Sequence, residues 1–560
     1  MQKAKRFFNK YFFAFSFVLY AILLHLFYWK TRGAGFVFDM TEWLYDYERY
    51  PNFKIFNPPF DKNLRPVYHF LLNTIYKTFG TDFKAWYLFN MGLFYGTILA
   101  IHSFLSYFYK TFQVEKYKEL TILTCIAIAV CPFGSEIAVW YATIHYSIVF
   151  ICLFLTCILL LSQGQSLFLR AVLSALLFSI AILSIELSYS IIPIVGSLFL
   201  LLYWRQKTDL RFNQYIIFFF IPHLLIFLGY NFICYKYYDK FLGHYRIDKV
   251  DFDLLYLIVH YFKLLVKHFT FVNILGQGVY DTFFQWIDEY RILFTACFLV
   301  PISYLIFKIR RRLLSPSPEI AIILFFISCS VFLYIPVSFL FYHNWKEIEL
   351  DRLGYGSMAF IIMALFFVFW QVKSTGIKAI FFTAFLLVSS LLLYNYNSRW
   401  EKSATVRKHF SDNIPFYKDK NVYLVGAPIL MQYAYLITIN DSLELYRHLR
   451  VFRKLQPTKE YKILGFYNML DIDDIVSVTK LNDMCVEVRV ERWGAWCWSS
   501  LKSAIEPKET NKYIVEPNDD KLGYKITFKS LDSNDKIILF NKLNFKEVDL
   551  RNKPNGTIYI

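Results

Sequence analysis

The sequence lacks the patterns that mark several common classes of protein. Its nine cysteines include no CxxC pair and its eleven histidines form no cluster, so nothing in it indicates a zinc site. No nucleic-acid-binding motif is present either, although the formal net charge is +17. Much of that charge lies in short loops between apolar segments, where the positive-inside bias of membrane proteins and anionic lipid account for it. We therefore expect no nucleic-acid partner.

Charged residues are also scarce, at 18% of the chain against 57% hydrophobic residues. Apolar runs of about 20 residues, the length that crosses a bilayer, recur over the first two thirds of the sequence. This pattern predicts an all-α, multi-spanning membrane helix bundle with about eleven transmembrane helices. The predicted segments are 11–29, 86–109, 118–132, 136–161, 167–184, 187–204, 213–235, 290–307, 318–342, 352–370 and 376–396.

The positively charged loops predict the orientation in an integral membrane. The first apolar segment follows a Lys/Arg-rich start and lacks a small-residue cleavage site, so we expect it to be kept as an anchor. With the N-terminus cytoplasmic, most lysines and arginines of the short loops fall on the inner side. The absence of appended repeats and the short tail favour a bacterial inner membrane. Because the protein is expected to be an integral membrane protein, we expect membrane lipids among its partners.

Two regions do not read as simple spans. Residues 236–289 are rich in charge and predict a periplasmic or re-entrant loop within a transmembrane domain of residues 1–399. In residues 400–560 the hydrophobic runs shorten to strand length, as at 421–426 and 524–528, which predicts a small soluble α/β domain on the periplasmic side. Cys485 and Cys497 lie in this domain, where an oxidising compartment would permit a disulfide, and the sequence leaves that pairing open.

The first periplasmic loop, residues 30–85, gathers carboxylates beside the bilayer. Asp39 is surrounded in sequence by apolar residues, among them Phe36, Phe38 and Trp43, which would raise its pKa toward a range useful for proton abstraction. Glu42 lies three residues on and would share a helix face with Asp39, as a partner or as a ligand for Mg²⁺ or Mn²⁺. The alternative is a solvated loop carboxylate with no chemical role.

Six motifs in order resemble those of a known family. They are Phe36-Val37-Phe38-Asp39, Arg65-Pro66-Val67, Asn90, the segment 132–140 with Glu136 and Trp140, Ile185-Glu186, and the segment 351–357 with Arg352 and Tyr355. Together they resemble the C-type glycosyltransferases (GT-C fold), in particular the protein O-mannosyltransferases and their tetratricopeptide-repeat transmembrane relatives. The resemblance covers about residues 30–400. Met40 replaces the family's second Asp and Ile185 replaces its Lys.

The resemblance implies an inverting sugar transfer from a polyprenyl-phosphate donor to a protein, glycan or lipid acceptor at the periplasmic face. The residue matching the family's first-loop Asp is Asp39, which implies that it activates the acceptor, either as the general base or by holding a metal ion, Mg²⁺ or Mn²⁺, that does so. A lipid phosphate leaves in such a reaction and needs nearby positive charge. Arg352 is the first candidate, because it occupies the arginine of the family's motif and because arginine binds phosphate in a bidentate manner.

Other candidates have weaker claims on a role. Arg65, Arg246, Lys263 and Lys267 are further phosphate ligands, or else headgroup contacts or solvated residues. Arg352 has an alternative too, as an ion pair with Asp351 or Glu349. Glu136 and Glu186 lie at the outer edge of apolar spans, where an ionised group is costly and a functional role is expected. Glu186 could equally be a structural partner for an arginine. Asn90 and Tyr355 are supporting candidates from the family motifs.

A flippase or transporter of a lipid-linked saccharide is the competing function. Transporters commonly contain inverted repeats and carry their important charges near the bilayer midplane. The sequence contains no clear internal duplication, and its candidate residues gather at one membrane face. This arrangement favours interfacial chemistry over passage through the bilayer.

Overall fold

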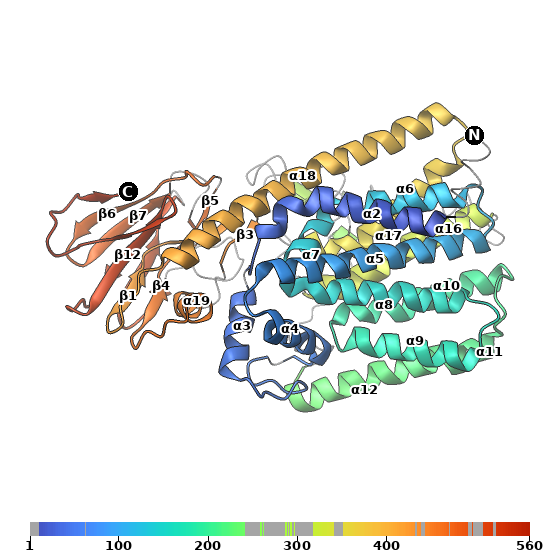
Figure 1. Cartoon of the computed structure of the whole chain (residues 1–560), viewed down its shortest axis with the longest axis horizontal. Coiled ribbons are helices and arrows are strands. Elements are labelled where there is room, and N and C mark those ends of the chain that lie inside the picture. Colours follow the sequence, from blue (N-terminus) through green and yellow to red (C-terminus); the bar gives the residue numbers. More distant parts are fainter. Residues whose placement is uncertain are drawn as a thin grey trace.

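The computed structural model describes residues 11–240, 317–340 and 351–560, with isolated residues between 258 and 296. Short gaps within these ranges lie at residues 38, 62, 432–433, 438–442, 470, 491–494, 497–507 and 519–521. The molecule is elongated, with a bundle of long helices at one end and a strand-rich region at the other (Figure 1). The helical membrane bundle and the separate C-terminal region are confirmed.

Helices occupy all ten predicted apolar segments that fall mainly within the described residues; most of the segment 290–307 lies outside them. These helices are α2 (Phe12–Tyr28), α5 (Phe83–Thr111), α6 (Tyr117–Ala129), α8 (Ile144–Leu161), α9 (Leu167–Ile182), α10 (Ile191–Trp204), α11 (Phe212–Tyr215) continuing through the π-helix η5 (Ile216–Phe220) into α12 (Ile221–Tyr238), α16 (Pro318–Leu340), α17 (Asp351–Gln371) and α18 (Thr375–Asn413).

Eight helices in the described part of the chain are long and apolar enough to cross a membrane, or nine if a bent pair counts as one span. The predicted count of eleven is therefore not supported. Two of the predicted spans account for much of the difference. Helix α9 has only 16 residues, and the predicted segment 118–132 covers α6, the first helix of the bent pair Tyr117–Ala129 and Pro132–Val139. The chain is an integral membrane protein by helix length and composition.

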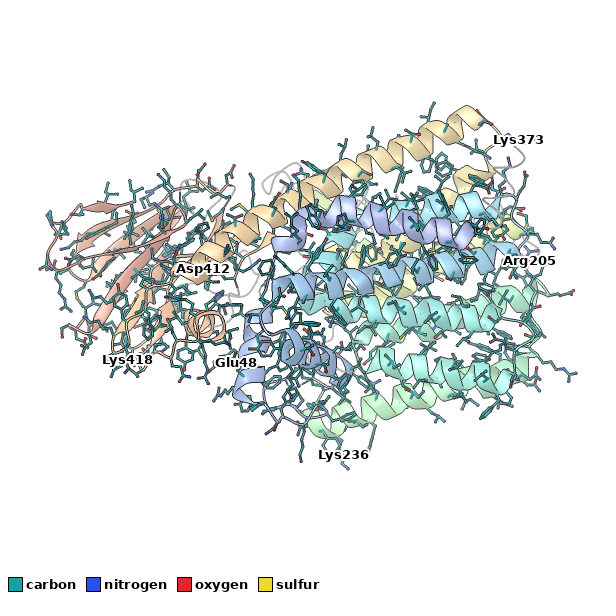
Figure 2. All side chains as sticks on the ribbon, in the orientation of Figure 1. Glu48, Arg205, Lys236, Lys373, Asp412 and Lys418 are labelled. Atoms are coloured by element: carbon teal, nitrogen blue, oxygen red, sulfur yellow. The ribbon has the colours of Figure 1, made fainter. Side chains whose placement is uncertain are left out.

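Charged residues collect at the two ends of the bundle. Figure 2 shows Arg205 and Lys373 together at the end remote from the strand-rich region, and Glu48 and Lys236 at the opposite end. Arg205 and Lys373 belong to two loops that the sequence predicts to be cytoplasmic, so these loops do share one end of the bundle. Which membrane face that end occupies stays a prediction.

Three short helices fill the loop between α2 and α5. They are the 3₁₀ helix η1 (Trp29–Gly33), α3 (Asp39–Arg49) and α4 (Pro66–Phe79). Pro66 is the first residue of α4. Proline suits this position, because an N–H group there would have no intrahelical partner and nothing is lost by its absence. Buried His69 of α4 fastens the loop: its Nε2 lies 2.7 Å from Asp61 Oδ2 and its Nδ1 3.0 Å from the Tyr47 hydroxyl. The loop is thus a packed cap on the bundle.

The C-terminal region contains three sheets and one helix, α19 (Glu444–Arg453), among its described residues. One sheet has the order β13 (Asn544–Glu547), β12 (Asp535–Asn541), β1 (Asn421–Leu424), β4 (Tyr461–Ile463), with β1 parallel to both neighbours. The largest is antiparallel throughout: β14 (Ile558–Tyr559), β6 (Val476–Asn482), β7 (Cys485–Val490), β11 (Gly523–Phe528), β10 (Tyr513–Pro517), β9 (Lys508–Glu509). The third is β3 (Ala434–Tyr435), β2 (Ala427–Met431), β5 (Phe466–Met469), β8 (Ala495–Trp496).

Strands therefore dominate a region that the sequence predicts as α/β. The two predicted strands are present as β1 and β11. Helix α18 runs without a break through residues 399 and 400, so one continuous helix joins the bundle to the sheets (Figure 1). Cys485 is buried at the start of β7, and Cys497 lies outside the described residues, so the proposed disulfide stays open.

Candidate functional site

A break in one apolar segment creates the framework of the candidate site. After α6 the chain turns through η2 (Pro132–Gly134), α7 (Ser135–Val139) and η3 (Tyr141–Thr143) before α8, with a bend of 59° between α6 and the following pair of short helices. Cys131 has φ −64° and ψ 123°, an extended conformation typical of the residue before a proline. Pro132 lacks an N–H and cannot continue α6. The broken segment is buried throughout.

Two side chains, Asn90 and Thr143, donate hydrogen bonds to backbone carbonyl groups of this segment. Asn90 of α5 donates from Nδ2 to the carbonyl oxygens of Ile137, at 3.1 Å, and Ala138, at 2.7 Å. The Thr143 hydroxyl donates to the carbonyl oxygen of Trp140, at 2.6 Å. Irregular backbone at membrane depth is tolerated only where protein groups replace the missing helical hydrogen bonds. Asn90, a supporting candidate by sequence, therefore supports the fold of the break.

Replacing Asn90 by leucine is expected to destabilise the protein by about 1–3 kcal/mol, because two buried carbonyl groups lose their donor. The measurement is thermal unfolding of the purified protein in detergent. Ser179→Ala is the control, because the Ser179 hydroxyl donates to the Ala175 carbonyl oxygen of its own helix, α9, at 2.9 Å. Equal unfolding temperatures for the two variants would contradict the role given to Asn90.

Glu136 and Arg352 form a buried ion pair across this break. Arg352 Nη1 lies 3.3 Å from Glu136 Oε2, and the Arg352 backbone N–H, at the start of α17, donates to the same oxygen at 2.9 Å. The Arg352 guanidinium also lies over the Trp140 ring, 4.4 Å from its centroid. The Glu136 carboxylate thus caps the N-terminus of α17 and also orients the Arg352 side chain. Glu136 is a partner that the sequence analysis did not assign to Arg352.

Trp140 links this pair to the helix that begins at Asp39. Its indole N–H donates to the Val37 carbonyl oxygen at 3.1 Å, and the Met40 N–H donates to that same carbonyl. Asp39 is the first residue of α3, and its side chain lies outside the described part of the structure. The backbone that carries Asp39 is therefore fastened to the aromatic ring on which Arg352 stacks.

Arg65 and Glu186 form a second pair of opposite charges. The Val67 N–H donates to the Leu183 carbonyl oxygen at 3.2 Å, which joins the start of α4 to the end of α9 just before Glu186. Burial lowers the pKa of Arg65, but the carboxylates of Glu186 and Asp61 outweigh burial and leave that pKa raised. Arg65 therefore carries a firmly held positive charge at the bundle end.

Tyr146 brings the two arginines into one site. This buried residue of α8 interacts electrostatically with both Arg352 and Arg65. Its neighbour His145 meets the Tyr68 ring edge to face, with the ring centroids 4.9 Å apart. Sequence reasoning missed Tyr146, because it is one of 43 tyrosines and lies in an apolar span with no distinguishing motif. The structure thus brings Arg65, Glu136 and Arg352 together around Tyr146, with Glu186 beside Arg65.

An apolar cavity of about 340 Å³ opens beside Glu186. It lies between the 3₁₀ helix η4 (Glu186–Ser190), α10, α12 and α16, and Glu186 is the one charged residue among its described lining residues. Tyr189, Phe227 and Pro336 are among its apolar walls. A hydrocarbon chain would suit this surface, with its polar end toward Glu186 and Arg65.

Helix α19 of the C-terminal region and the residue after it are joined to α3 by two ion pairs. Arg447 Nη2 lies 3.3 Å from Glu42 Oε1, and Lys454 Nζ lies 2.5 Å from Glu48 Oε1. The Glu42 carboxylate is therefore paired with a guanidinium, and its binding of Mg²⁺ or Mn²⁺ together with Asp39 stays a prediction. No group of three His, Cys, Asp or Glu side chains suited to a metal ion occurs among the described residues.

The remaining candidates have a packing role or lie outside the described residues. The Tyr355 hydroxyl donates to the Ile128 carbonyl oxygen at 3.3 Å, and its ring lies 3.0 Å from where a Cβ on Gly134 would stand. Tyr355 therefore holds α17 against the break. Arg246, Lys263 and Lys267 lie outside the described part of the chain, as does most of the loop 236–289.

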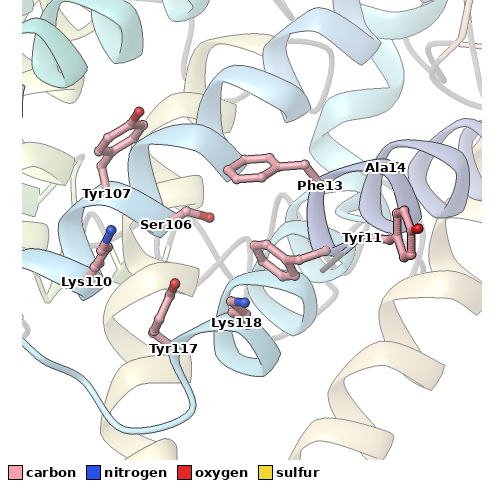
Figure 3. Close-up of a pocket in the computed structure, with 9 residues that line it drawn as sticks. Tyr11, Phe13, Ala14, Ser106, Tyr107, Lys110, Tyr117 and Lys118 are labelled. Atoms are coloured by element: carbon pink, nitrogen blue, oxygen red, sulfur yellow. The ribbon is translucent and has the colours of Figure 1, made fainter. Parts of the chain in front are cut away.

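A second cavity, of about 440 Å³, lies at the opposite end of the bundle, where α2 begins, α5 ends and α6 begins (Figure 3). Lys110 and Lys118 line it together with Tyr107 and Tyr117, and none of its described lining residues is a carboxylate. Both lysines belong to a predicted cytoplasmic loop, where they suit contact with anionic headgroups. This cavity is remote from the site around Arg352.

No protein-family model matches the chain, and no significant match to a curated protein is found. The GT-C resemblance therefore rests on the motifs of the sequence alone.

Proposed function

We propose that this protein is a membrane glycosyltransferase that moves a sugar from a polyprenyl-phosphate donor to a protein, glycan or lipid acceptor at the periplasmic face. The observation that carries the proposal is the convergence of Arg352 and Arg65 on Tyr146, at the bundle end where α3 begins with Asp39. Two fixed positive charges suit a phosphate leaving group, whose charge develops as the glycosidic bond breaks.

The cavity beside Glu186 supports the lipid part of the proposal. A polyprenyl chain in this cavity would bring its phosphate toward the end occupied by Glu186 and Arg65. The two carboxylates of the site keep the arginines oriented when no phosphate is bound. Such preorganisation lowers the cost of aligning donors at the moment of reaction.

The proposed reaction is a single displacement at the anomeric carbon. Asp39 accepts the proton of the acceptor group, and the acceptor atom then bonds to the anomeric carbon from the side opposite the phosphate. The bond between that carbon and the phosphate oxygen breaks, and the polyprenyl phosphate leaves with the electron pair, stabilised by Arg352 and Arg65. Attack from the opposite side inverts the anomeric configuration.

The ion pairs between α19 and α3 give the C-terminal region a part in this scheme. They fix the helix that begins with the proposed base, so the sheets beyond α19 support the site from outside the membrane. An acceptor would approach along this junction.

The test is sugar transfer by the purified protein from a panel of polyprenyl-phosphate sugars, with release of polyprenyl phosphate as the readout. Release in the presence of an acceptor is the expected result. A folded protein that binds the lipid-linked sugars and releases no lipid phosphate from any of them would overturn the proposal.

A flippase or transporter of a lipid-linked saccharide is the second candidate. The observation in its favour is the break between α6 and α8, because interrupted helices are common at transporter binding sites. In reconstituted vesicles a transporter would move intact lipid-linked sugar across the bilayer without releasing lipid phosphate. The same panel therefore separates the two functions.

A further inference from the structure

The junction between the bundle and the C-terminal region contains a basic pocket that the proposed reaction does not use. Its volume is about 620 Å³. It is lined by η1, the start of α5, the last turns of α18 and Phe452 of α19. Four basic and two acidic side chains line it: Lys30, Arg32, Arg407, Lys408, Glu401 and Asp412.

Arg407 is the unusual member of this set. Arg407 is only 5% exposed, and its Nη1 atom is buried with no hydrogen-bond partner among the described residues. The guanidinium lies against the backbone of Gly35, where a Cβ would stand 3.5 Å from Nη2. Gly35 has φ +63°, a left-handed conformation that glycine adopts without strain.

A buried arginine normally pairs with a carboxylate, because an uncompensated buried charge is strongly destabilising. Arg170 does so in the same bundle, with its Nη1 2.9 Å from Asp209 Oδ2. Among the described residues no carboxylate pairs with Arg407, and Glu401 lies 3.8 Å from Lys30 instead. The pocket therefore lacks the anion that its most buried cation requires.

Two of the other basic residues, Lys30 and Arg32, contact aromatic side chains. Lys30 Nζ donates to the Tyr394 hydroxyl at 2.8 Å, and the Arg32 guanidinium lies 3.9 Å from the centroid of the Trp29 ring. Trp and Tyr gather at the level of lipid headgroups, which carry phosphate. This level favours phosphate over a protein carboxylate as the missing anion.

We propose that this pocket binds a phosphate group, with Arg407 as the buried ligand and Lys30 and Arg32 at its rim. The expected source is the headgroup of an anionic lipid in the leaflet at this end of the bundle. Bound there, the lipid would join η1, α18 and α19, and so stabilise the attachment of the C-terminal region. The proposal does not depend on sugar transfer.

The experiment measures lipid binding by the detergent-purified full chain, using native mass spectrometry and thermal unfolding. Phosphatidylglycerol, phosphatidylcholine and inorganic phosphate are added separately to wild type, Arg407→Gln and Lys418→Gln. Lys418 is exposed in the C-terminal region, away from the lining residues, so its variant makes the same charge change outside the pocket.

Wild type is expected to bind phosphatidylglycerol in preference to phosphatidylcholine, and Arg407→Gln to bind it about 10- to 100-fold more weakly, as for the loss of a charge-assisted hydrogen bond. Lys418→Gln should behave as wild type. A response to inorganic phosphate alone that disappears in Arg407→Gln would assign the site to free phosphate in place of lipid.

Arg32→Gln is the second variant, because Arg32 is exposed and its loss does not threaten folding. It should weaken phosphatidylglycerol binding in the same direction by a smaller factor. Equal binding of phosphatidylglycerol by wild type, Arg407→Gln and Arg32→Gln, or equal binding of the two lipids by wild type, would overturn the proposal.

Discussion

Asp39→Asn is expected to lower the rate of lipid-phosphate release by about 10²- to 10⁴-fold, the contribution typical of a general base. Asparagine is close in size to aspartate and cannot accept the acceptor's proton at neutral pH, so the loss should appear in kcat more than in donor affinity. The measurement is the initial rate of polyprenyl-phosphate release at matched protein concentration. Unfolding temperatures of the two proteins should agree.

Glu42→Gln is the matched control for this experiment. Glu42 lies on the same helix three residues from Asp39, and its carboxylate pairs with Arg447 at 3.3 Å. A partly exposed pair of this kind contributes about 0–1 kcal/mol to stability. We expect Glu42→Gln to lower the rate far less than Asp39→Asn does. A rate for Asp39→Asn as high as that of Glu42→Gln would remove Asp39 from the mechanism.

Arg352→Lys and Arg352→Ala are expected to lower kcat/KM for the donor by increasing amounts, with the alanine variant reduced about 10²- to 10³-fold. Lysine keeps the charge but loses the planar fork and the stacking on Trp140, so it should retain part of the activity. The measurement is the rate of lipid-phosphate release as a function of donor concentration.

Arg170→Lys provides the control for a buried arginine. Arg170 of α9 is buried and paired with Asp209 at the other end of the bundle. Asp209 belongs to the same loop as Arg205. Its substitution should lower the unfolding temperature without changing kcat/KM for the donor. An Arg352→Ala variant that folds and turns over donor as wild type does would contradict the phosphate role of Arg352.

The sequence was a good guide to the apolar helices and a weaker one to their number. Segments such as 352–370 are recognisable because crossing the hydrocarbon core demands a long unbroken apolar run, whatever the neighbours are. The bent pair at Pro132 was merged with its flanking runs, because composition alone does not say whether a helix breaks or crosses. Burial of that break depends on Asn90, which donates to it from a distant helix, and on Thr143 within the break itself.

Several residues of the candidate site could be named from the sequence, but their pairings could not. Glu136 and Arg352 were each singled out by motif and by the cost of charge near the bilayer. Their mutual contact joins residues 216 positions apart in the chain, and no local pattern encodes it. Arg407 was missed for a similar reason, since its isolation in the junction pocket depends on Gly35, α18 and α19 meeting there.

The sequence by itself determined that this chain is a membrane helix bundle followed by a strand-forming region. Both properties follow from local composition, because hydrophobic run length and strand patterning act within a few residues. Only the tertiary structure decided which charges neutralise one another and which do not. That choice depends on distances of a few ångströms between distant segments, and in a low-dielectric interior those distances fix whether a charge is held, shared or left for a ligand.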